Sequence, residues 1–454
     1  MLDEAWTAVA GSSGTRPADL RVSGPDGLLP SPFPVLETAV ACASTALLAA
    51  AALRGHKTAE LDREHVADAF RSERFVRVNG QPLGDRFAPL SRFWPAADGW
   101  VRTHANYPWH RDALLDVLGV SPDGVGLAIA ERNAAELEDA VLAAGGIAVA
   151  VRDERTWRQS EQARLLAGRP LMLSERIGSA PPRPRRPGEG ARPASDIKVL
   201  DLTRVIAGPT GTRFLGALGA DVLRIDPPHR PELPLHQVDG LLGKRSALLD
   251  ATMPDGLSTL HELLDQADVL VHGYRAHALD RFGLTAHALA ERHPGLVVVS
   301  LSAWGDDGPW GGRRGFDSIV QAASGIALVE SADGTTPGAL PCQLLDHGTG
   351  YLCAAAALTA LTAQQREGGT HFRSLALART ALWLLDQPRC GVEGHAPTRE
   401  PTRLSTLDSA DGPVTMVDPL GTLDGVPLTW PPKLASYGAA RAQWSGDGTR
   451  GRAS

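Results

Sequence analysis

The sequence predicts an α/β protein with a parallel sheet in its second half and a smaller α/β domain in its first half. Between residues 197 and 302, short apolar runs alternate with longer amphipathic stretches, the pattern of strands joined by crossover helices. Residues 179–195 are dense in proline and cannot hold a helix or an inner strand, so they separate the two halves. The hydrophobic share of 43% over 454 residues is that of a globular protein, and this length suggests two domains.

The strands of this sheet are expected at 197–202, 221–226, 268–273 and 296–302. The helices between them are expected at 208–219, 254–266 and 284–292. Such a sheet is Rossmann-like, and its ligands bind beyond the carboxyl ends of the strands. The turn after the first strand lacks the Gly-x-Gly-x-x-Gly pattern of a dinucleotide site, so a nicotinamide cofactor is not expected.

Domain boundaries follow from these elements. We expect an N-terminal helical segment with a small domain at 1–178, then the proline-rich linker at 179–195. The Rossmann-like domain should occupy 196–385, and a C-terminal tail at 386–454 should pack back on it.

Composition excludes several classes of function. A net charge of −7 gives no basic field for nucleic acid. The cysteines Cys42, Cys342, Cys353 and Cys390 stand far apart without ligand spacing, so neither a metal site nor a disulfide is expected. No signal peptide is visible, and the longest apolar stretch, 40–53, is shorter than a membrane span. We therefore expect a cytoplasmic protein without a membrane partner, in which this stretch is a buried helix.

An internal repeat surrounds two acidic residues. In the second half, Pro341 precedes Asp346 and Gly350 follows it, ahead of a long Ala/Leu-rich stretch and a turn. In the first half, Pro32 precedes Glu37 with the same spacing, again ahead of an Ala/Leu-rich stretch and a turn. Two Ala/Leu-rich helices can look alike by chance, but the matched proline, acid and turn favour duplication.

Short motifs follow one another in the second half: Val199-Leu-Asp-Leu-Thr-Arg-Val-Ile-Ala-Gly-Pro, Leu218-Gly-Ala-Asp-Val-Leu-Arg-Ile-Asp-Pro-Pro, Gly243-Lys-Arg-Ser and Ala267-Asp-Val-Leu-Val-His-Gly-Tyr. In this order they resemble the family III CoA-transferases, which include formyl-CoA transferase and carnitine CoA-transferase. The resemblance covers nearly all of 195–385, and residues 93–185 resemble the family's small domain. Here the small-domain half comes first, so the chain looks like two fused copies that each lack one part.

The resemblance implies a CoA-transferase that moves CoA from an acyl-CoA thioester to a carboxylic acid. Family members use an aspartate with a glycine four positions later, and Asp346-His-Gly-Thr-Gly350 matches. Asp346 is thus implied to be a nucleophile that forms covalent aspartyl intermediates. Gly348 and Gly350 would let the backbone approach those intermediates. On the residues alone, Asp346 could instead cap the helix that follows.

CoA, as acyl-CoA substrate, is the cofactor that the resemblance implies, with no metal. Its contacts are implied to be Arg204, Val205, Ala207, Leu249, Tyr274, Arg281 and Arg314. The arginines suit the phosphate groups, and Tyr274 suits the adenine ring. On the residues alone, each arginine could equally form a surface ion pair.

The chain departs from the family pattern at several positions. Ile206 stands in place of a glutamine and Thr252 in place of a lysine. The mobile glycine loop after the nucleophile is missing, and the candidate replacement at 79–84 could equally be a plain turn. These departures leave open a non-catalytic CoA-binding protein as an alternative.

A racemase of the same fold is the other alternative. Acyl-CoA racemases carry a histidine at the position before Asp317, where this chain has Phe316, which cannot carry a proton. Transfer is therefore favoured. Because family members form interlocked dimers, the resemblance also implies a homodimer.

Overall fold

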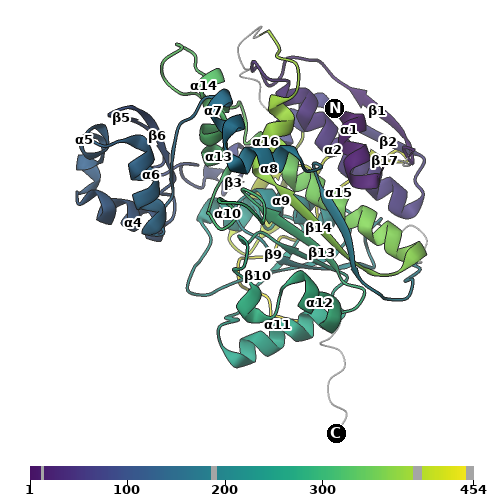
Figure 1. The fold of residues 1–454 in the computed structure, drawn as a ribbon. Coiled ribbons are helices and arrows are strands. Elements are labelled where there is room, and N and C mark those ends of the chain that lie inside the picture. The colour runs from purple at the N-terminus through teal and green to yellow at the C-terminus, as the bar shows by residue number, and fades with distance from the viewer. Residues whose placement is uncertain (12–14, 186–191, 392–400, 446–454) are drawn as a thin grey trace.

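The computed structural model describes residues 1–11, 15–185, 192–391 and 401–445. A seven-stranded sheet forms its centre, in the order β11-β10-β9-β12-β13-β14-β8 (Figure 1). Its strands are β8 (Leu173–Gly178), β9 (Lys198–Leu202), β10 (Asp221–Asp226), β11 (Arg245–Leu248), β12 (Val269–His272), β13 (Val297–Ser302) and β14 (Thr370–Ala376). All are parallel except β8, which runs antiparallel to β14 at one edge. The strand order reverses between β9 and β12, which creates a crevice at their carboxyl ends.

Helices cover both faces of the sheet: α9 (Ala207–Ala217) and α15 (Leu344–Glu367) on one, and α11 (Pro254–Gln266) and α12 (Ala286–Arg292) on the other. The two layers arise because successive strand residues point to opposite sides. In β9, Val199 joins the core beneath α9 and α15, and its neighbour Leu200 joins the core beneath α11 and α12. The expected parallel sheet is confirmed, with β9, β10, β12 and β13 starting within one residue of their predicted positions.

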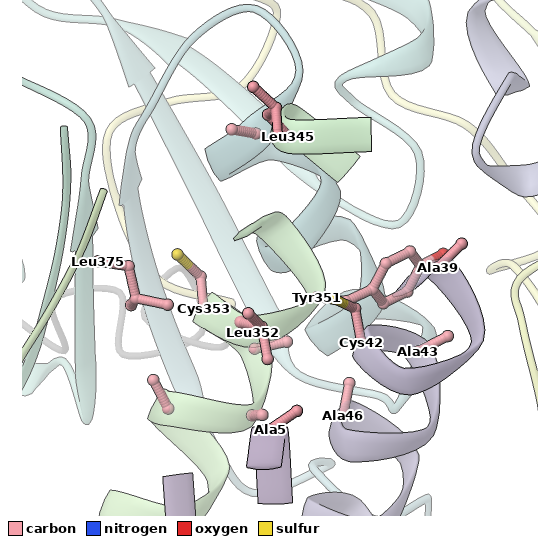
Figure 2. Packing of buried hydrophobic residues seen from close by; sticks show 14 of the residues in the cluster. Ala5, Ala39, Cys42, Ala43, Ala46, Leu345, Tyr351, Leu352, Cys353 and Leu375 are labelled. Atoms are coloured by element: carbon pink, nitrogen blue, oxygen red, sulfur yellow. The ribbon is translucent and has the colours of Figure 1, made fainter. Parts of the chain in front are cut away.

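The first half begins with α1 (Leu2–Ala10) and α2 (Val35–Arg54), which pack beside α15. The small side chains of Ala39, Ala43 and Ala46 on α2 let the two long helices approach closely, as Figure 2 shows. By length and composition α2 could cross a membrane, but 83% of its most apolar window is buried inside the protein. The expected buried helix over 40–53 is therefore confirmed.

A small α/β unit projects from one side of the molecule (Figure 1). It contains β5 (Phe93–Ala96), β6 (Gly99–Thr103), β7 (Ala148–Ala150), α4 (Pro108–Leu118), α5 (Val125–Ala130) and α6 (Ala134–Ala143). Its strands form a separate antiparallel sheet, and its apolar side chains form a core of their own. After this unit, α7 (Glu154–Gln159) and α8 (Glu161–Ala167) lead to β8.

The two halves exchange strands. From the first half, β8 joins the central sheet beside β14. From the C-terminal segment, β17 (Thr422–Leu423) pairs with β2 (Thr58–Asp62), and β16 (Gly412–Val417) pairs with β3 (Arg77–Val78). The strands that complete these two small sheets are β1 (Asp19–Ser23), β4 (Gln81–Pro82), β15 (Leu404–Ser409) and β18 (Val426–Pro427). The halves are therefore joined by backbone hydrogen bonds as well as by apolar packing.

The repeat has a counterpart in this arrangement. In the first half, α2 is followed by β2 and by α3 (Arg63–Ala69). In the second half, α15 is followed by β14 and by α16 (Leu377–Leu385). Each of the two strands also has one parallel and one antiparallel neighbour. The helix–strand–helix unit is thus present twice, although β14 belongs to the central sheet and β2 to a small one.

Candidate active site

A cavity of about 730 Å³ opens beyond the carboxyl ends of the central strands. Residues 202–205 after β9 and 273–275 after β12 form neighbouring parts of its wall, so it lies at the switch point of the sheet. The cavity brings together most of the residues predicted from the sequence, namely Asp346, Arg204, Val205, Ala207, Leu249, Tyr274, Arg281 and Arg314. Gly348 and Gly350 do not line it.

Asp346 is the third residue of α15, where the N-terminal end of the helix favours a negative charge. Asp346 is buried, with 4% of its surface exposed. Burial raises the pKa of Asp346 well above its ordinary value, and the negative charges of Asp317 and Glu73 raise it further. The protonated form of this carboxyl is thus favoured, and a positive or hydrogen-bonding group close to it would be needed to favour the carboxylate.

Asp317, the first residue of α13 (Asp317–Ser324), lies directly beside Asp346. Its Oδ2 accepts a hydrogen bond from the backbone N–H of Asp346 at 3.0 Å, and its Oδ1 accepts one from Gln321. Burial raises the pKa of Asp317 to about 6 in spite of these hydrogen bonds. The two carboxyl groups therefore titrate as a pair, and Asp317 fixes the start of α15.

Glu73 reaches this place from the first half of the chain. It is fully buried, and its Oε2 lies 3.2 Å from Nε2 of His347, the residue after Asp346. Burial opposes ionisation of Glu73, but the hydrogen bond and charge of His347 hold its pKa low, at about 2. His347 Nδ1 in turn lies 3.3 Å from the Thr210 hydroxyl on α9. A buried polar chain thus links both halves at the nucleophile candidate.

Gly348 and Gly350 have a packing explanation. A Cβ on Gly350 would lie 2.3 Å from the Ala207 carbonyl oxygen, and one on Gly348 would lie 3.3 Å from Cys42 Sγ. Glycine at 350 therefore allows α15 to cross α9 in close contact. Gly348 faces α2. The two glycines therefore allow neighbouring helices to pack closely. Neither lines the cavity, so the structure does not place them where reaction intermediates were expected to bind.

The loop after β9 is held by a buried carboxylate. Glu232 Oε2 accepts a hydrogen bond from the backbone N–H of Val205 at 3.0 Å. The same oxygen forms an ion pair with Arg224 at 3.0 Å. Val205 has a φ of 68°, a strained conformation for a β-branched residue. Arg204 lies 3.6 Å from Glu232 and over the rings of Tyr107 and Trp109. Arg204 therefore already has a carboxylate partner.

Other cations surround the mouth of the cavity. Arg230, Arg275 and Arg281 are exposed there, and Arg314 is half-buried among them. Burial, and the charges of Arg275 and Arg230, lower the pKa of Arg314. These like charges repel one another, and an anion such as a phosphate would relieve the repulsion. The cluster is therefore suited to binding an anion.

The first half supplies the opposite wall, which reasoning from the sequence missed. Tyr107, Trp109 and His110 form the start of α4 and line the cavity. His104 stacks on Phe316 with ring centroids 3.8 Å apart, and His110 meets Phe316 edge-on at 6.2 Å. The sequence does show a proline at the first helical position, with two aromatic residues and a histidine beside it. Nothing in the spacing of these residues indicated that they lie near Asp346.

The departures from the family pattern have defined places. Ile206 is buried at the start of α9, and Thr252 lines the cavity with its hydroxyl bonded to Asp250. In 79–84, Asn79 and Gly80 form the turn between β3 and β4, both with positive φ, and none of the segment lines the cavity. The segment is thus a hairpin turn. No three His, Cys, Asp or Glu side chains in the described ranges are grouped to hold a metal.

Residues 195–416 match the sequence profile described as CoA-transferase family III. This part of the chain, just under half of it, is similar to that family, which is a family of enzymes. A "probable fatty acyl-CoA transferase" of Mycobacterium tuberculosis is 30% identical over 207 residues, which are 43% of this chain and 52% of that protein. A "formyl-CoA:oxalate CoA-transferase" of Streptomyces coelicolor is 31% identical over 226 residues, 46% of this chain and 54% of that one.

A solved structure of a hypothetical protein from Mycobacterium tuberculosis is also similar, at 31% identity and a TM-score of 0.40, over 43% of this chain and 58% of that one. The chain thus spans about half the length of the curated relatives it matches. The resemblance to family III CoA-transferases is confirmed for its second half.

Proposed function

We propose that the protein is an acyl-CoA:carboxylate CoA-transferase with Asp346 as its covalent nucleophile. The observation that carries the proposal is that one cavity joins the carboxyl of Asp346 to a mouth lined by arginines. A CoA thioester has its reactive carbonyl at one end and its phosphates at the other, which suits such a cavity. CoA would lie across the loops after β9 and β12, with Tyr274 and Leu249 on its adenine side.

The proposed reaction needs no oxidant and no external energy source. A carboxylate oxygen of Asp346 attacks the thioester carbonyl carbon, the C–S bond breaks, and CoA thiolate leaves behind an acyl–aspartyl anhydride. The thiolate attacks the aspartyl carbonyl and releases the first acid, giving an enzyme–CoA thioester. The acceptor carboxylate attacks this thioester, and the released thiolate takes the new acyl group and frees Asp346.

Asp317 and Glu73 have distinct parts in the proposal. Asp317 fixes the backbone of Asp346, so the carboxyl is held at one place on the cavity wall. The negative charges of both acids keep Asp346 weakly acidic, which makes its carboxylate a stronger nucleophile once formed. CoA and the two acids are the only partners that the proposal requires, and a cytoplasmic homodimer completes it.

The racemase alternative requires a second proton carrier across the cavity from Asp346. Phe316 cannot serve, and His110, the cavity-lining imidazole that contacts Phe316, is a poor base. Burial, with the charges of Arg314, Arg230 and Arg204, lowers the pKa of His110 to about 3. A base this weak would remove an α-proton slowly, so transfer remains the favoured function.

The proposal is tested with Asp346→Asn and its repeat counterpart Glu37→Gln. Both acids are the third residue of a long helix, but Glu37 is exposed and lies outside the cavity wall. We expect Asp346→Asn to lower turnover at least 10³-fold, because an amide is not a nucleophile here, with CoA affinity changed less than threefold. Glu37→Gln should keep nearly full activity.

The measurements are steady-state transfer from acetyl-CoA and succinyl-CoA to a panel of acids, intact-protein mass after acyl-CoA addition, and calorimetric CoA titration. Wild type and Glu37→Gln should show a covalent adduct that Asp346→Asn lacks. Retained turnover in purified Asp346→Asn would exclude the assignment.

A further inference from the structure

His110 occupies an unusual position in the cavity wall. It is 5% exposed, its Nδ1 is enclosed by protein, and no described residue forms a hydrogen bond to that nitrogen. Its ring neighbours are the aromatic rings of Tyr107, Trp109 and Phe316, none of which is placed to accept a proton from it. The ring nevertheless lines the cavity, so it meets the cavity with the side that carries Nε2.

The proton of the neutral ring is assigned by this environment. A neutral imidazole has one donor and one acceptor nitrogen. A buried N–H without an acceptor is costly, so the proton belongs on Nε2, where a ligand in the cavity can accept it. His110 is therefore a preformed hydrogen-bond donor whose partner is not part of the protein.

The surroundings of this donor favour an anionic partner. His110 lies in the first turn of α4, an 11-residue helix whose N-terminal end carries positive partial charge. Arg314, Arg230 and Arg204 are close enough to act on its ring electrostatically. A carboxylate or phosphate oxygen would receive both the Nε2–H and this positive potential.

The position of His110 decides between these two anions. Arg275 and Arg281 are exposed at the cavity mouth, where the phosphates of CoA would meet them, and neither is among the charges that act on His110. Arg230 does act on His110 from the side of the mouth, but the His110 ring also contacts Phe316, and the next residue, Asp317, holds the backbone of Asp346. The donor is therefore on the side of the nucleophile, where the carboxylates of the reaction must enter and leave.

We propose that His110 and the first turn of α4 bind the carboxylate of the acceptor acid, so that the first half of the chain supplies the acceptor subsite. This inference rests on the proposed transfer function. His110 is a substrate-binding residue in it and does not form a bond to the acyl group. A substrate acid held there presents its second oxygen toward Asp346.

The test compares His110→Phe with His110→Gln, which keeps a donor, and with His104→Phe as the matched control. His104 comes from the same segment and stacks on Phe316 but does not line the cavity. Each variant is assayed for acceptor KM and kcat with acetate, oxalate and succinate, for adduct formation from acetyl-CoA or succinyl-CoA, and for affinity toward CoA and 3′-dephospho-CoA. Thermal denaturation checks that each is folded.

We expect His110→Phe to raise the acceptor KM at least tenfold, while adduct formation and CoA affinity stay within about twofold of wild type. His110→Gln should recover most of the loss, and His104→Phe should leave the KM nearly unchanged. An unchanged KM in His110→Phe overturns the inference, as does a loss of CoA affinity that disappears with 3′-dephospho-CoA, which would indicate a phosphate site. If wild type forms no adduct and transfers nothing, the proposed function itself fails.

Discussion

At the scale of single residues, the environment of Asp346 determines its reactivity. Asp317 accepts the backbone N–H of Asp346, and the negative charge of Glu73, which is bonded to the neighbouring His347, raises the pKa of Asp346. The sequence pointed to Asp346 because this residue and the glycine of its motif are close together in the chain. It could not point to Glu73, since this residue is 274 positions away from His347 and the two meet only after folding. His110 was not predicted for the same reason, because it lies far from Asp346 in the sequence.

The charge of Asp317 gives a pH-dependent prediction. Because this charge raises the pKa of Asp346 wherever Asp317 is ionised, Asp317→Asn should lower the apparent pKa of Asp346 and leave a larger ionised fraction above about pH 6, where Asp317 is ionised in the wild type. The rate of adduct formation should therefore rise with pH in both proteins, with the rising limb of the variant displaced to lower pH. An Asn oxygen can still accept the backbone N–H of Asp346, so the position of the nucleophile should be retained.

The measurement is single-turnover adduct formation from pH 4.5 to 9. Asp317→Asn should form adduct at about the wild-type rate at the acid end and faster than wild type above about pH 6, where Asp317 is ionised in the wild type. At the alkaline end it should be slower, because its less basic carboxylate is the weaker nucleophile. Superimposable pH profiles would mean that the two carboxyl groups do not interact in the working enzyme.

At the scale of elements, the helices and inner strands of the second half could be predicted because their apolar periodicity is strong. Strand β8 could not, because all six of its residues are exposed or half-buried at an edge and carry no alternating pattern. The helix crossings were also hidden. Gly350 looked like a residue of the reaction centre, whereas a contact with α9, far away in the sequence, accounts for its lack of a side chain.

The contact between α9 and α15 predicts that Gly350 and Gly348 differ in how well they tolerate substitution by alanine. In Gly350→Ala the new methyl group would clash with the backbone of Ala207 and with Thr210, neither of which can move without shifting α9. We expect a loss of about 2–4 kcal/mol in unfolding free energy. Activity should also fall, because the Val205 loop leads directly into α9. Gly348→Ala meets only the Cys42 sulfur and should cost about 1 kcal/mol or less.

Denaturant unfolding and steady-state kinetics on both variants provide the check. If Gly348→Ala and Gly350→Ala had equal unfolding free energies, α9 and α15 would be packed less closely at Gly350 than the structure shows.

At the scale of the whole molecule, the first half completes the second. It provides Glu73, His110 and the edge strand β8, so the second half alone lacks one wall of the cavity. The sequence suggested a fused pair from the repeat and from the displaced small domain. The exchange of strands between the halves was not predictable, because β8 and β17 pair with segments far away in the chain and β17 has only two residues.

This organisation predicts the behaviour of a split protein. Residues 1–185 and 192–454, co-expressed as separate chains, should copurify and keep at least a tenth of the transfer activity, since α2 packs on α15 and β8 pairs with β14. Residues 192–454 alone should aggregate, because the open edge of β14 and the uncovered face of α15 would be exposed. Copurification and activity measurements decide this, and a soluble, active 192–454 fragment would contradict it.

The pairing of β8 with β14 also bears on how the chain folds as it leaves the ribosome. The contact between Arg373 and Glu175 joins positions 198 residues apart, so β8 emerges long before its partner exists. At roughly 5–20 residues per second, β8 remains without its partner strand for on the order of 10–40 s. Such non-local pairing is slow to form and leaves early segments open to wrong contacts. We therefore expect refolding from denaturant to be slow and yield-limited, and to depend on protein concentration, even though the finished protein is a closely packed one.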